Sequence, residues 1–409
     1  MELKIVAACL CAVSFSFAQW GGNFGGQQQG GGKIEYSEKF PDVNYVGDGK
    51  TYHALDIYLP KETKDSYPVV VHTYGSAWAM NDSKGSADLN TICAGFLKAG
   101  YAVVTPNHRS ADDAKYPAQL HDLKAVVRFL RGNAAKYKLD TSFIAMSGFS
   151  SGGHLSSLVA TTCGLKEGKS GSVTVDLVGD LGEYTSLSSC IDGAVLWSPP
   201  TDIYTMNPIN NFMGSGTYEG KFIGVEREGN KDKWMVASSP YYASEDDPPV
   251  ILFHGTADPI VNPEQSQELY DSLMKYNVVT ELVSVSGGTH GGNEMYVSEN
   301  LDKAVSFLNT AREAKAASVE VTPPDTSTQD STVQDSTVQD SSAVGDSVIT
   351  ALPVLRSMAS GPVSYKVFTI DGTLVMKSSS LDLSRLNPGV YYVVSTSRSG
   401  RQIFRFAKR

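Results

Sequence analysis

Between residues 34 and 315, short apolar runs alternate with segments whose apolar residues recur at helical spacing. The short runs are typical of buried strands, and the amphipathic segments are typical of helices that cover a sheet. We predict strands at 68–74, 101–104, 143–147, 191–197, 249–253 and 279–285, and helices at 89–98, 119–137, 152–161, 263–276 and 298–314. This alternation predicts an α/β fold, in which βαβ units build a mostly parallel sheet with helices on both faces.

The end of the chain follows a different pattern. Residues 316–350 contain the repeat STQD-STVQD-STVQD, with acidic residues, no basic ones and few large apolar side chains. Such a segment cannot bury a core, so we interpret it as an extended acidic linker. Residues 351–409 alternate apolar and polar positions between turn sequences such as Asp371-Gly372 and Asn387-Pro388-Gly389. That pattern predicts a small antiparallel β-domain.

The beginning of the chain has the pattern of a targeting segment. A short basic start, MELK, precedes an apolar run that ends at Phe17, with small residues just before Gln19. This predicts a secretory signal peptide over residues 1–18, and the run is too short to span a bilayer. Residues 19–33 are rich in Gly and Gln, which is typical of a flexible segment. We therefore expect a secreted or cell-surface protein with no transmembrane segment in the mature chain.

Composition and cysteine content narrow the function classes. The chain has 409 residues, 41% of them hydrophobic, and a formal net charge of −10. This balance allows a substantial core and argues against nucleic-acid binding as the main role. Cys93, Cys163 and Cys190 remain after the signal segment. A Cys163–Cys190 disulfide and free thiols are both open, because an exported chain permits the bridge but does not require it. No Cys/His spacing matches a zinc site, and we expect no metal and no cofactor.

A candidate nucleophile stands in Gly148-Phe149-Ser150-Ser151-Gly152, which fits G-x-S-x-G. The motif alone is weak in a chain with 38 glycines. Its context is more specific, because a predicted strand ends just before it and a predicted helix begins at its last glycine. In such a strand–turn–helix the serine lies on a sharp turn with its Oγ exposed. The pattern predicts Ser150 as a nucleophile.

A nucleophilic serine needs a general base, and the base needs an acid to orient it. Asp258, in HGTADP, follows the predicted strand 249–253, and His290, in GGTHGG, follows the next one. The order Ser, Asp, His is the one expected for this kind of fold, so we predict a Ser150–His290–Asp258 triad. Asp202, which also follows a strand, is the alternative acid. Of the other histidines, we expect His254 to order its own loop; the rest we interpret as structural: His53, His72, His108, His121 and His154.

The oxyanion of an acyl-transfer reaction needs preorganised donors, usually backbone N–H groups. We predict that one is the N–H of Ser151, at the start of the helix that follows the nucleophile. The other is expected from the loop after the first predicted strand, Tyr74-Gly75-Ser76-Ala77-Trp78, with Gly75 or Ser76 as donor.

At these residues the stretch 34–315 resembles the α/β-hydrolase esterases, especially the bacterial branch related to feruloyl and acetyl xylan esterases (BD-FAE-like). The resemblance lies in YGSAW at 74–78, PAQLHDLKAVVRFLRGNA at 117–134, GFSSGGHL at 148–155 and WSPPTD at 197–202, with further similarity at 237–261 and 287–292. In that family an H-G-G-G/A-W loop usually precedes the elbow, whereas Tyr74 and Ser76 depart from it here, and Ser151 replaces a frequent Ala. Within the shared motifs we predict Trp78 and Trp197 as substrate-binding residues. The resemblance implies a polysaccharide ester substrate from plant cell walls, such as xylan.

The tail, 351–409, resembles the C-terminal sorting domain of type IX secretion, in YKVFTIDGTLV at 365–375, LDLSRLNPGVYY at 381–392 and the basic end of the chain. This resemblance implies a secretion machinery as partner. A carbohydrate-binding module is the alternative, because Tyr391, Tyr392, Phe404 and Phe406 alternate in a β-domain.

Three functions are compatible with the sequence. The favoured one is a secreted serine esterase that removes acetyl or feruloyl groups from hemicellulose. A serine peptidase of the oligopeptidase type shares the same triad, and a non-catalytic carbohydrate-binding surface protein is the third candidate. Residues 204–242 are expected to lie over the site; their large apolar side chains could stack on a substrate or form a lid core: Phe212, Met213, Tyr218, Phe222 and Trp234.

Overall fold

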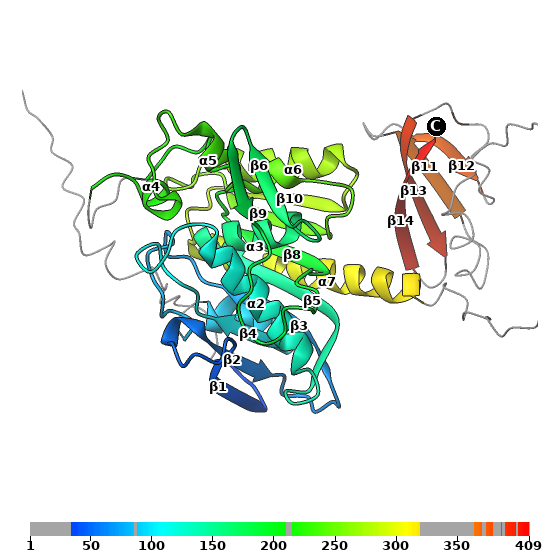
Figure 1. Cartoon of the computed structure of the whole chain (residues 1–409). Helices are drawn as coiled ribbons and strands as arrows, with labels where there is room; N and C mark the ends of the chain where they lie inside the picture. The colour runs from blue at the N-terminus through cyan, green and yellow to red at the C-terminus, as the bar shows by residue number, and fades with distance from the viewer. Residues whose placement is uncertain are drawn as a thin grey trace, which may run out of the picture. The chain divides into compact units, whose positions relative to one another are not determined.

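The computed structural model describes residues 34–85, 88–209 and 215–319, together with strands between 364 and 408 (Figure 1). The predicted signal peptide (1–18), the Gly/Gln-rich segment (19–33) and residues 320–350 of the predicted linker lie outside the described residues. The chain divides into two compact units, residues 1–325 and 326–409. No helix in the described ranges has the length and apolarity needed to cross a bilayer.

An eight-stranded sheet forms the centre of the first unit, in the order β1-β2-β4-β3-β5-β8-β9-β10. All six predicted strands are present, and β1 and β2 are additional strands at one edge. There β1 pairs antiparallel with β2, and β2 pairs antiparallel with β4. The remaining neighbours are parallel, which confirms the predicted α/β class. The strands are β1 (Glu38–Asn44), β2 (Ala54–Leu59), β3 (Tyr67–Thr73), β4 (Ala102–Pro106), β5 (Leu139–Phe149), β8 (Gly193–Trp197), β9 (Val250–Gly255) and β10 (Thr280–Val285).

Helices cover both faces of this sheet, and each face buries its own apolar core (Figure 1). One core receives side chains from α2 (Ala118–Gly132), α3 (Ser151–Thr161) and α6 (Glu264–Lys275). The other receives them from α1 (Ala94–Lys98) and α7 (Ser298–Val319). The strands at the centre are buried on both sides, which explains why their sequences are continuously apolar instead of alternating.

Two helix ends differ from the prediction. Helix α2 stops at Gly132 instead of residue 137. At this end both the backbone N–H and the side-chain amide of Asn133 donate to the Phe129 carbonyl. Helix α7 continues to Val319, so the first residues assigned to the linker are helical. Ala314, Ala316 and Ala317 favour this extension, because alanine has the highest helix propensity.

The segment between α3 and β8 is an excursion closed by a disulfide between Cys163 and Cys190, the pairing considered from the sequence. It carries a hairpin, β6 (Glu167–Ser170) with β7 (Val173–Asp176). Four cationic or imidazole side chains on one side of α2 hydrogen-bond to backbone carbonyls in or next to the excursion: His121, Lys124, Arg128 and Arg131. These four side chains therefore hold the excursion in place against α2.

Two short helices, α4 (Tyr218–Ile223) and α5 (Lys231–Met235), lie in the segment between β8 and β9. The second unit contains an antiparallel sheet in the order β12-β11-β13-β14, which confirms the predicted strand arrangement. Its strands are β11 (Ser364–Thr369), β12 (Leu374–Ser378), β13 (Gly389–Ser397) and β14 (Gly400–Lys408). The side chains of Tyr391, Tyr392, Phe404 and Phe406 lie outside the described residues.

Candidate active site

Ser150 lies on a sharp turn between β5 and α3, at φ +53°, ψ −124°. A non-glycine residue rarely adopts a positive φ, so the surrounding backbone must hold it there. Two glycines make the turn possible. A Cβ on Gly148 would overlap the Gly152 carbonyl, and a Cβ on Gly152 would overlap the Thr73 carbonyl. The backbone N–H of Ser150 also donates to the Trp197 carbonyl at 2.9 Å, which ties the turn to β8.

His290 and Asp258 meet Ser150 at the carboxyl ends of the parallel strands. The Ser150 hydroxyl lies 2.9 Å from His290 Nε2, and His290 Nδ1 lies 2.7 Å from Asp258 Oδ2. With the neutral imidazole, Nδ1–H donates to the carboxylate and Nε2 accepts the serine proton. The structure therefore brings together the three residues predicted from the chain order.

Asp258 is held as a carboxylate. Burial alone would raise its pKa, but hydrogen bonds from His254 and His290 and the backbone N–H of Ile260 lower it well below its usual range. Asp258 Oδ1 accepts the backbone N–H groups of Ile260 and Val261 at 2.9 and 3.0 Å, which leaves Oδ2 for His290. This arrangement fixes both the charge and the direction of the acid.

Asp202, the alternative acid, and His254, which lies in the loop of Asp258, have other partners. Asp202 Oδ1 accepts from the Ser238 hydroxyl and from the backbone N–H of Tyr204, so it orders a turn and does not contact His290. His254 hydrogen-bonds to the Val261 carbonyl and the Ser266 hydroxyl at 2.9 and 2.6 Å. His254 therefore orders the loop that carries Asp258, as predicted.

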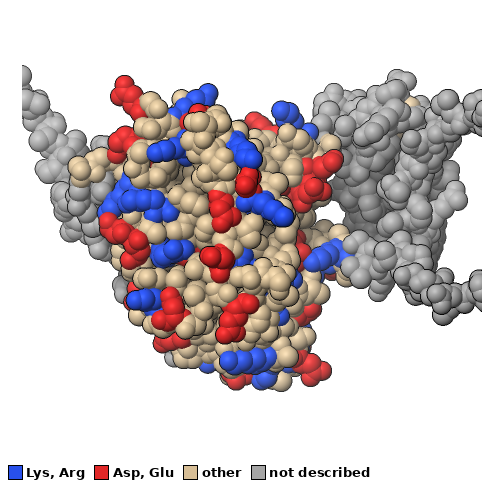
Figure 2. Space-filling view, in the orientation of Figure 1, with Lys and Arg blue, Asp and Glu red and all other residues tan. Residues whose placement is uncertain are grey.

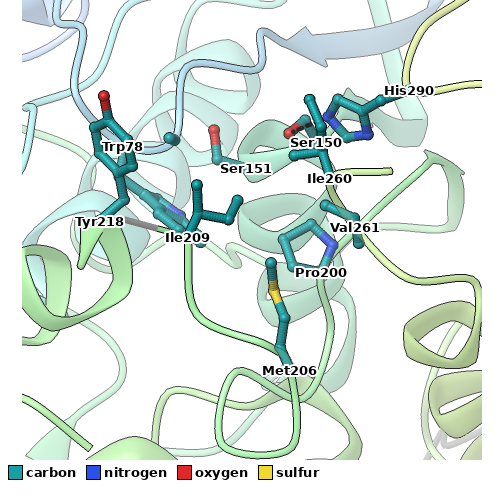
Figure 3. A pocket seen from close by; sticks show the side chains of 11 residues that line it. Trp78, Ser150, Ser151, Pro200, Met206, Ile209, Tyr218, Ile260, Val261 and His290 are labelled. Atoms are coloured by element: carbon teal, nitrogen blue, oxygen red, sulfur yellow. Dashed lines mark hydrogen bonds between the residues drawn. The ribbon is translucent and has the colours of Figure 1, made fainter. Parts of the chain in front are cut away.

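An apolar pocket opens beside Ser150 (Figure 3). It encloses about 30 Å³, and it is lined by Ala77, Trp78, Ser150, Ser151, Pro200, Met206, Ile209, Tyr218, Ile260, Val261 and His290. Of the large apolar side chains expected over the site, Tyr218 lines the pocket, whereas Phe222 and Trp234 are fully buried. Phe212 and Met213 lie outside the described residues.

The predicted oxyanion donors require one change. Ser151 lines the pocket at the start of α3, and no hydrogen bond is found for its backbone N–H within the described ranges. The Ser76 N–H donates at 2.8 Å to the Ser151 hydroxyl instead of pointing freely into the pocket, and Gly75 does not line the pocket. Ala77 does line it, at φ +50°, and its N–H has no partner among the described residues. Sequence reasoning missed Ala77, because nothing in the sequence marks the positive φ that turns its N–H.

Trp78 forms a wall of the pocket, although it is only 1% exposed. Its ring stacks on Phe222 with centroids 4.8 Å apart, and its indole N–H donates to His154 Nδ1 at 3.2 Å. His154 Nε2–H in turn donates to the Ala237 carbonyl at 2.8 Å. Burial lowers the pKa of His154 to about 4, so the ring is neutral and can accept from Trp78. His154 is therefore a positioning residue for the pocket wall.

Trp197 does not line the pocket, contrary to the prediction. It is fully buried on the face of the sheet covered by α1 and α7, and its indole stacks on Phe253 with centroids 4.2 Å apart. Trp197 is the last residue of β8, and its side chain points into the core while its carbonyl accepts the Ser150 N–H. Its contribution is to anchor the serine turn through the backbone.

The parallel sheet, the serine turn after β5 and the acid and histidine after β9 and β10 define the α/β-hydrolase fold. The BD-FAE family model matches residues 55–273, more than half of the chain, and the chain belongs to this family.

Two solved structures are similar in sequence as well as fold. A truncated carbohydrate esterase from gut microbiota is 38% identical with a TM-score of 0.65, covering 70% of this chain and all of that one. A bifunctional GH43-CE protein of Bacteroides eggerthii is 42% identical with a TM-score of 0.64, covering 67% of this chain and 35% of that one. A probable carboxylic ester hydrolase of Mycobacterium tuberculosis, LipM, is 25% identical over 57% of this chain and 51% of that protein. The chain spans about half the length of the curated relatives it matches.

Proposed function

We propose that the chain is a serine esterase that removes acetyl groups from polysaccharides by way of an acyl-enzyme. The observation that carries this proposal is the continuous contact from Ser150 through His290 to Asp258, with distances of 2.9 and 2.7 Å, at the edge of a small apolar pocket. A serine in such a contact has a base for its proton, and that base has an acid to fix its tautomer.

The reaction follows from these contacts. His290 Nε2 takes the Ser150 proton as Oγ attacks the ester carbonyl, and the backbone N–H groups of Ala77 and Ser151 receive the resulting oxyanion. His290 then protonates the leaving alcohol of the sugar. In the second half, His290 takes a proton from a water molecule as its oxygen attacks the acyl-enzyme. The intermediate then releases the acid, and His290 returns the proton to Ser150 Oγ. Asp258 keeps Nδ1 protonated and stabilises the imidazolium formed in both halves.

The size of the pocket favours acetyl over feruloyl esters. Its volume of about 30 Å³ suits a methyl group, whereas an engineered protein cavity that binds benzene measures roughly 150 Å³. Trp78 is immobilised by Phe222 and His154, so this wall cannot easily retreat for a larger acyl group. The apolar lining also excludes a charged or strongly hydrated acyl chain.

A carbohydrate as the alcohol part of the ester is supported by the carbohydrate-esterase names of two similar solved structures. Lys and Arg are interspersed with Asp and Glu over the face shown in Figure 2, with no large field of one sign. Such a surface suits a neutral polymer better than a polyanion. Export is part of the same proposal, supported by the sequence of residues 1–18 and by the resemblance of the tail to a sorting domain. A mature protein that begins near Gln19, detected outside the cell by mass spectrometry, is the expected result; an unprocessed cytoplasmic chain would contradict export.

The test is the acid released from acetylated and feruloylated xylan by the wild type and by Ser150→Ala. We expect acetate from the wild type, little ferulate, and a loss of at least about 10³-fold in the variant, since the nucleophile is gone. Far-ultraviolet circular dichroism and the melting temperature control for folding. Acetate release that survives Ser150→Ala would refute the nucleophile, and ferulate as the main product would refute the small acyl site. Cleavage of peptides in preference to esters would favour the peptidase alternative.

A further inference from the structure

Ser151 lines the same pocket as the proposed nucleophile, Ser150. Figure 3 shows the hydroxyl groups of both residues among the side chains that line the pocket. Ser151 is only 1% exposed, and it is one of the residues that line the pocket. A buried hydroxyl at this place is unexpected if only the backbone N–H of Ser151 matters, because an alanine would supply that N–H equally well.

The partners of this hydroxyl determine its direction. Ser151 Oγ accepts the backbone N–H of Ser76 at 2.8 Å, so its acceptor side is directed to the loop after β3. No acceptor for its own O–H is found among the described residues. A hydroxyl has one proton to donate, and a buried donor without a partner is costly. The remaining direction for the proton is the pocket, where the carbonyl oxygen of a bound ester would lie close to the N–H of the same residue.

We propose that the Ser151 hydroxyl is a third oxyanion donor, which connects the Ser76 N–H to the developing charge. This inference rests on the proposed serine-esterase function and adds a catalytic residue to it. The Ser76 N–H polarises the hydroxyl that it donates to, and the hydroxyl donates onward to the oxyanion. No proton is transferred in this step, so Ser151 remains a neutral alcohol throughout. Side-chain hydroxyls can serve as oxyanion donors in the same way as backbone N–H groups.

The backbone N–H of Ser76 has a different place in this arrangement from the other two N–H groups. The Ser76 N–H donates to the Ser151 hydroxyl, so it acts on the substrate only through that O–H group. The backbone N–H groups of Ala77 and Ser151 are the direct donors. A purely structural role for the hydroxyl would consist of satisfying the Ser76 N–H and nothing more. The two roles differ in their effect on the transition state, which makes them separable by experiment.

The first test is Ser151→Ala, which keeps the backbone N–H and removes the hydroxyl. Ser156→Ala is the matched control, since Ser156 lies on the same helix, is fully buried, and donates its O–H to the Ser147 carbonyl away from the pocket. With 4-nitrophenyl acetate we expect kcat to fall about 10- to 100-fold in Ser151→Ala, below the roughly 10²- to 10³-fold loss of a sole side-chain donor. KM should change less than about threefold, and Ser156→Ala should retain the wild-type kcat. An unchanged or increased kcat in Ser151→Ala would overturn the proposal.

The second test uses methylboronic acid, which forms a tetrahedral adduct with the nucleophilic serine and resembles the acetyl transition state. The inhibition constant of this probe should rise in Ser151→Ala by the same factor as kcat/KM falls, while inhibition by the product acetate stays constant. A structural defect would weaken both inhibitors together, and that result would overturn the proposal. Failure of the proposed function itself is distinguishable, because Ser150→Ala would then retain activity and the wild type would not bind the boronic acid.

Discussion

Two regions of this molecule contain a histidine between a serine and an aspartate. In the pocket, His290 links Ser150 and Asp258; inside the sheet, His72 on β3 lies 3.2 Å from the Ser147 hydroxyl and 3.0 Å from Asp88. The distances are similar, but the settings are not. Ser147 is an interior residue of β5 and is fully buried, as is His72 at 1% exposure, whereas Ser150 lies three residues later on a strained turn at the pocket.

The difference shows that the three residue types and their spacing do not by themselves make a catalytic site. The ring of His72 is used in the opposite sense, with Nε2 toward the carboxylate and Nδ1 toward the serine. Ser147 is not among the residues that line the pocket beside Ser150. What distinguishes Ser150 is the backbone around it: a positive φ, two glycines without Cβ atoms, and the donors of Ala77 and Ser151. The set around His72 satisfies buried polar groups instead.

The largest expected difference between the two regions is the change in kcat when the aspartate of each region, Asp258 or Asp88, is replaced by asparagine. Asp258→Asn should lower kcat about 10⁴-fold, because an amide no longer holds His290 in the tautomer that accepts the serine proton. Asp88→Asn should leave kcat within about threefold of the wild type, since His72 takes no part in the reaction. Steady-state kinetics with 4-nitrophenyl acetate measure both. A comparable loss of kcat in Asp88→Asn would show that the buried set also contributes to catalysis.

A smaller effect, on stability, is expected from Ser147→Ala. The substitution leaves His72 Nδ1 without its partner in a fully buried place, which should cost about 1–3 kcal/mol of unfolding free energy. The kcat per folded molecule should not change, in contrast to Ser150→Ala, which should lose activity while remaining folded. Urea unfolding gives the first quantity, and kinetics corrected for the folded fraction give the second. If Ser147→Ala unfolds at the wild-type urea concentration, the buried hydrogen bond is not stabilising.

The smallest effect concerns the buried histidine beneath the pocket wall. Burial lowers the pKa of His154 from 6.5 to about 4, so the unfolded chain takes up this proton at a higher pH than the folded one. The resulting stability is complete above about pH 6.5 and declines as the pH falls toward 4; between pH 7 and 5.5 the loss is roughly 1 kcal/mol. His154→Gln keeps an acceptor for Trp78 but does not titrate. Between pH 7 and 5.5, the unfolding free energy of this variant should therefore fall by roughly 1 kcal/mol less than that of the wild type. Equal pH dependence in both proteins would contradict the neutral, buried state of His154.

The juxtaposition of Ser150, His290 and Asp258 could be predicted from the sequence, because these residues follow strands whose apolar runs are easy to identify. Ser150, Asp258 and His290 each stand directly after such a run, and parallel strands bring their carboxyl ends to one edge of the sheet. Strands β1 and β2 and the hairpin β6–β7 were not predicted. Their sequences contain polar residues, and β1 also contains Pro41, so none of them shows a continuous apolar run.

The details of the pocket were harder to predict, because they depend on backbone direction and not on residue type. Ala77 and Trp78 have φ values of +50° and +57°, although neither is a glycine. Ala77 lines the pocket and its N–H has no partner among the described residues, whereas the Ser76 N–H donates to the Ser151 hydroxyl. Trp197 was misassigned for a related reason: it ends a central strand, where the direction of the side chain decides between the core and the pocket.

The disulfide that closes the segment between Cys163 and Cys190 affects what a proteolytic cut in this segment does to the chain. Much of this segment is exposed, so it offers proteases an accessible stretch of backbone. A single cut anywhere inside it would not release a fragment, because the disulfide still joins the two halves. The nicked molecule would migrate as one species without reductant and as two with it. The basic side chains of α2 would continue to hold backbone carbonyls on either side of the cut, so we expect the cleaved chain to keep its architecture.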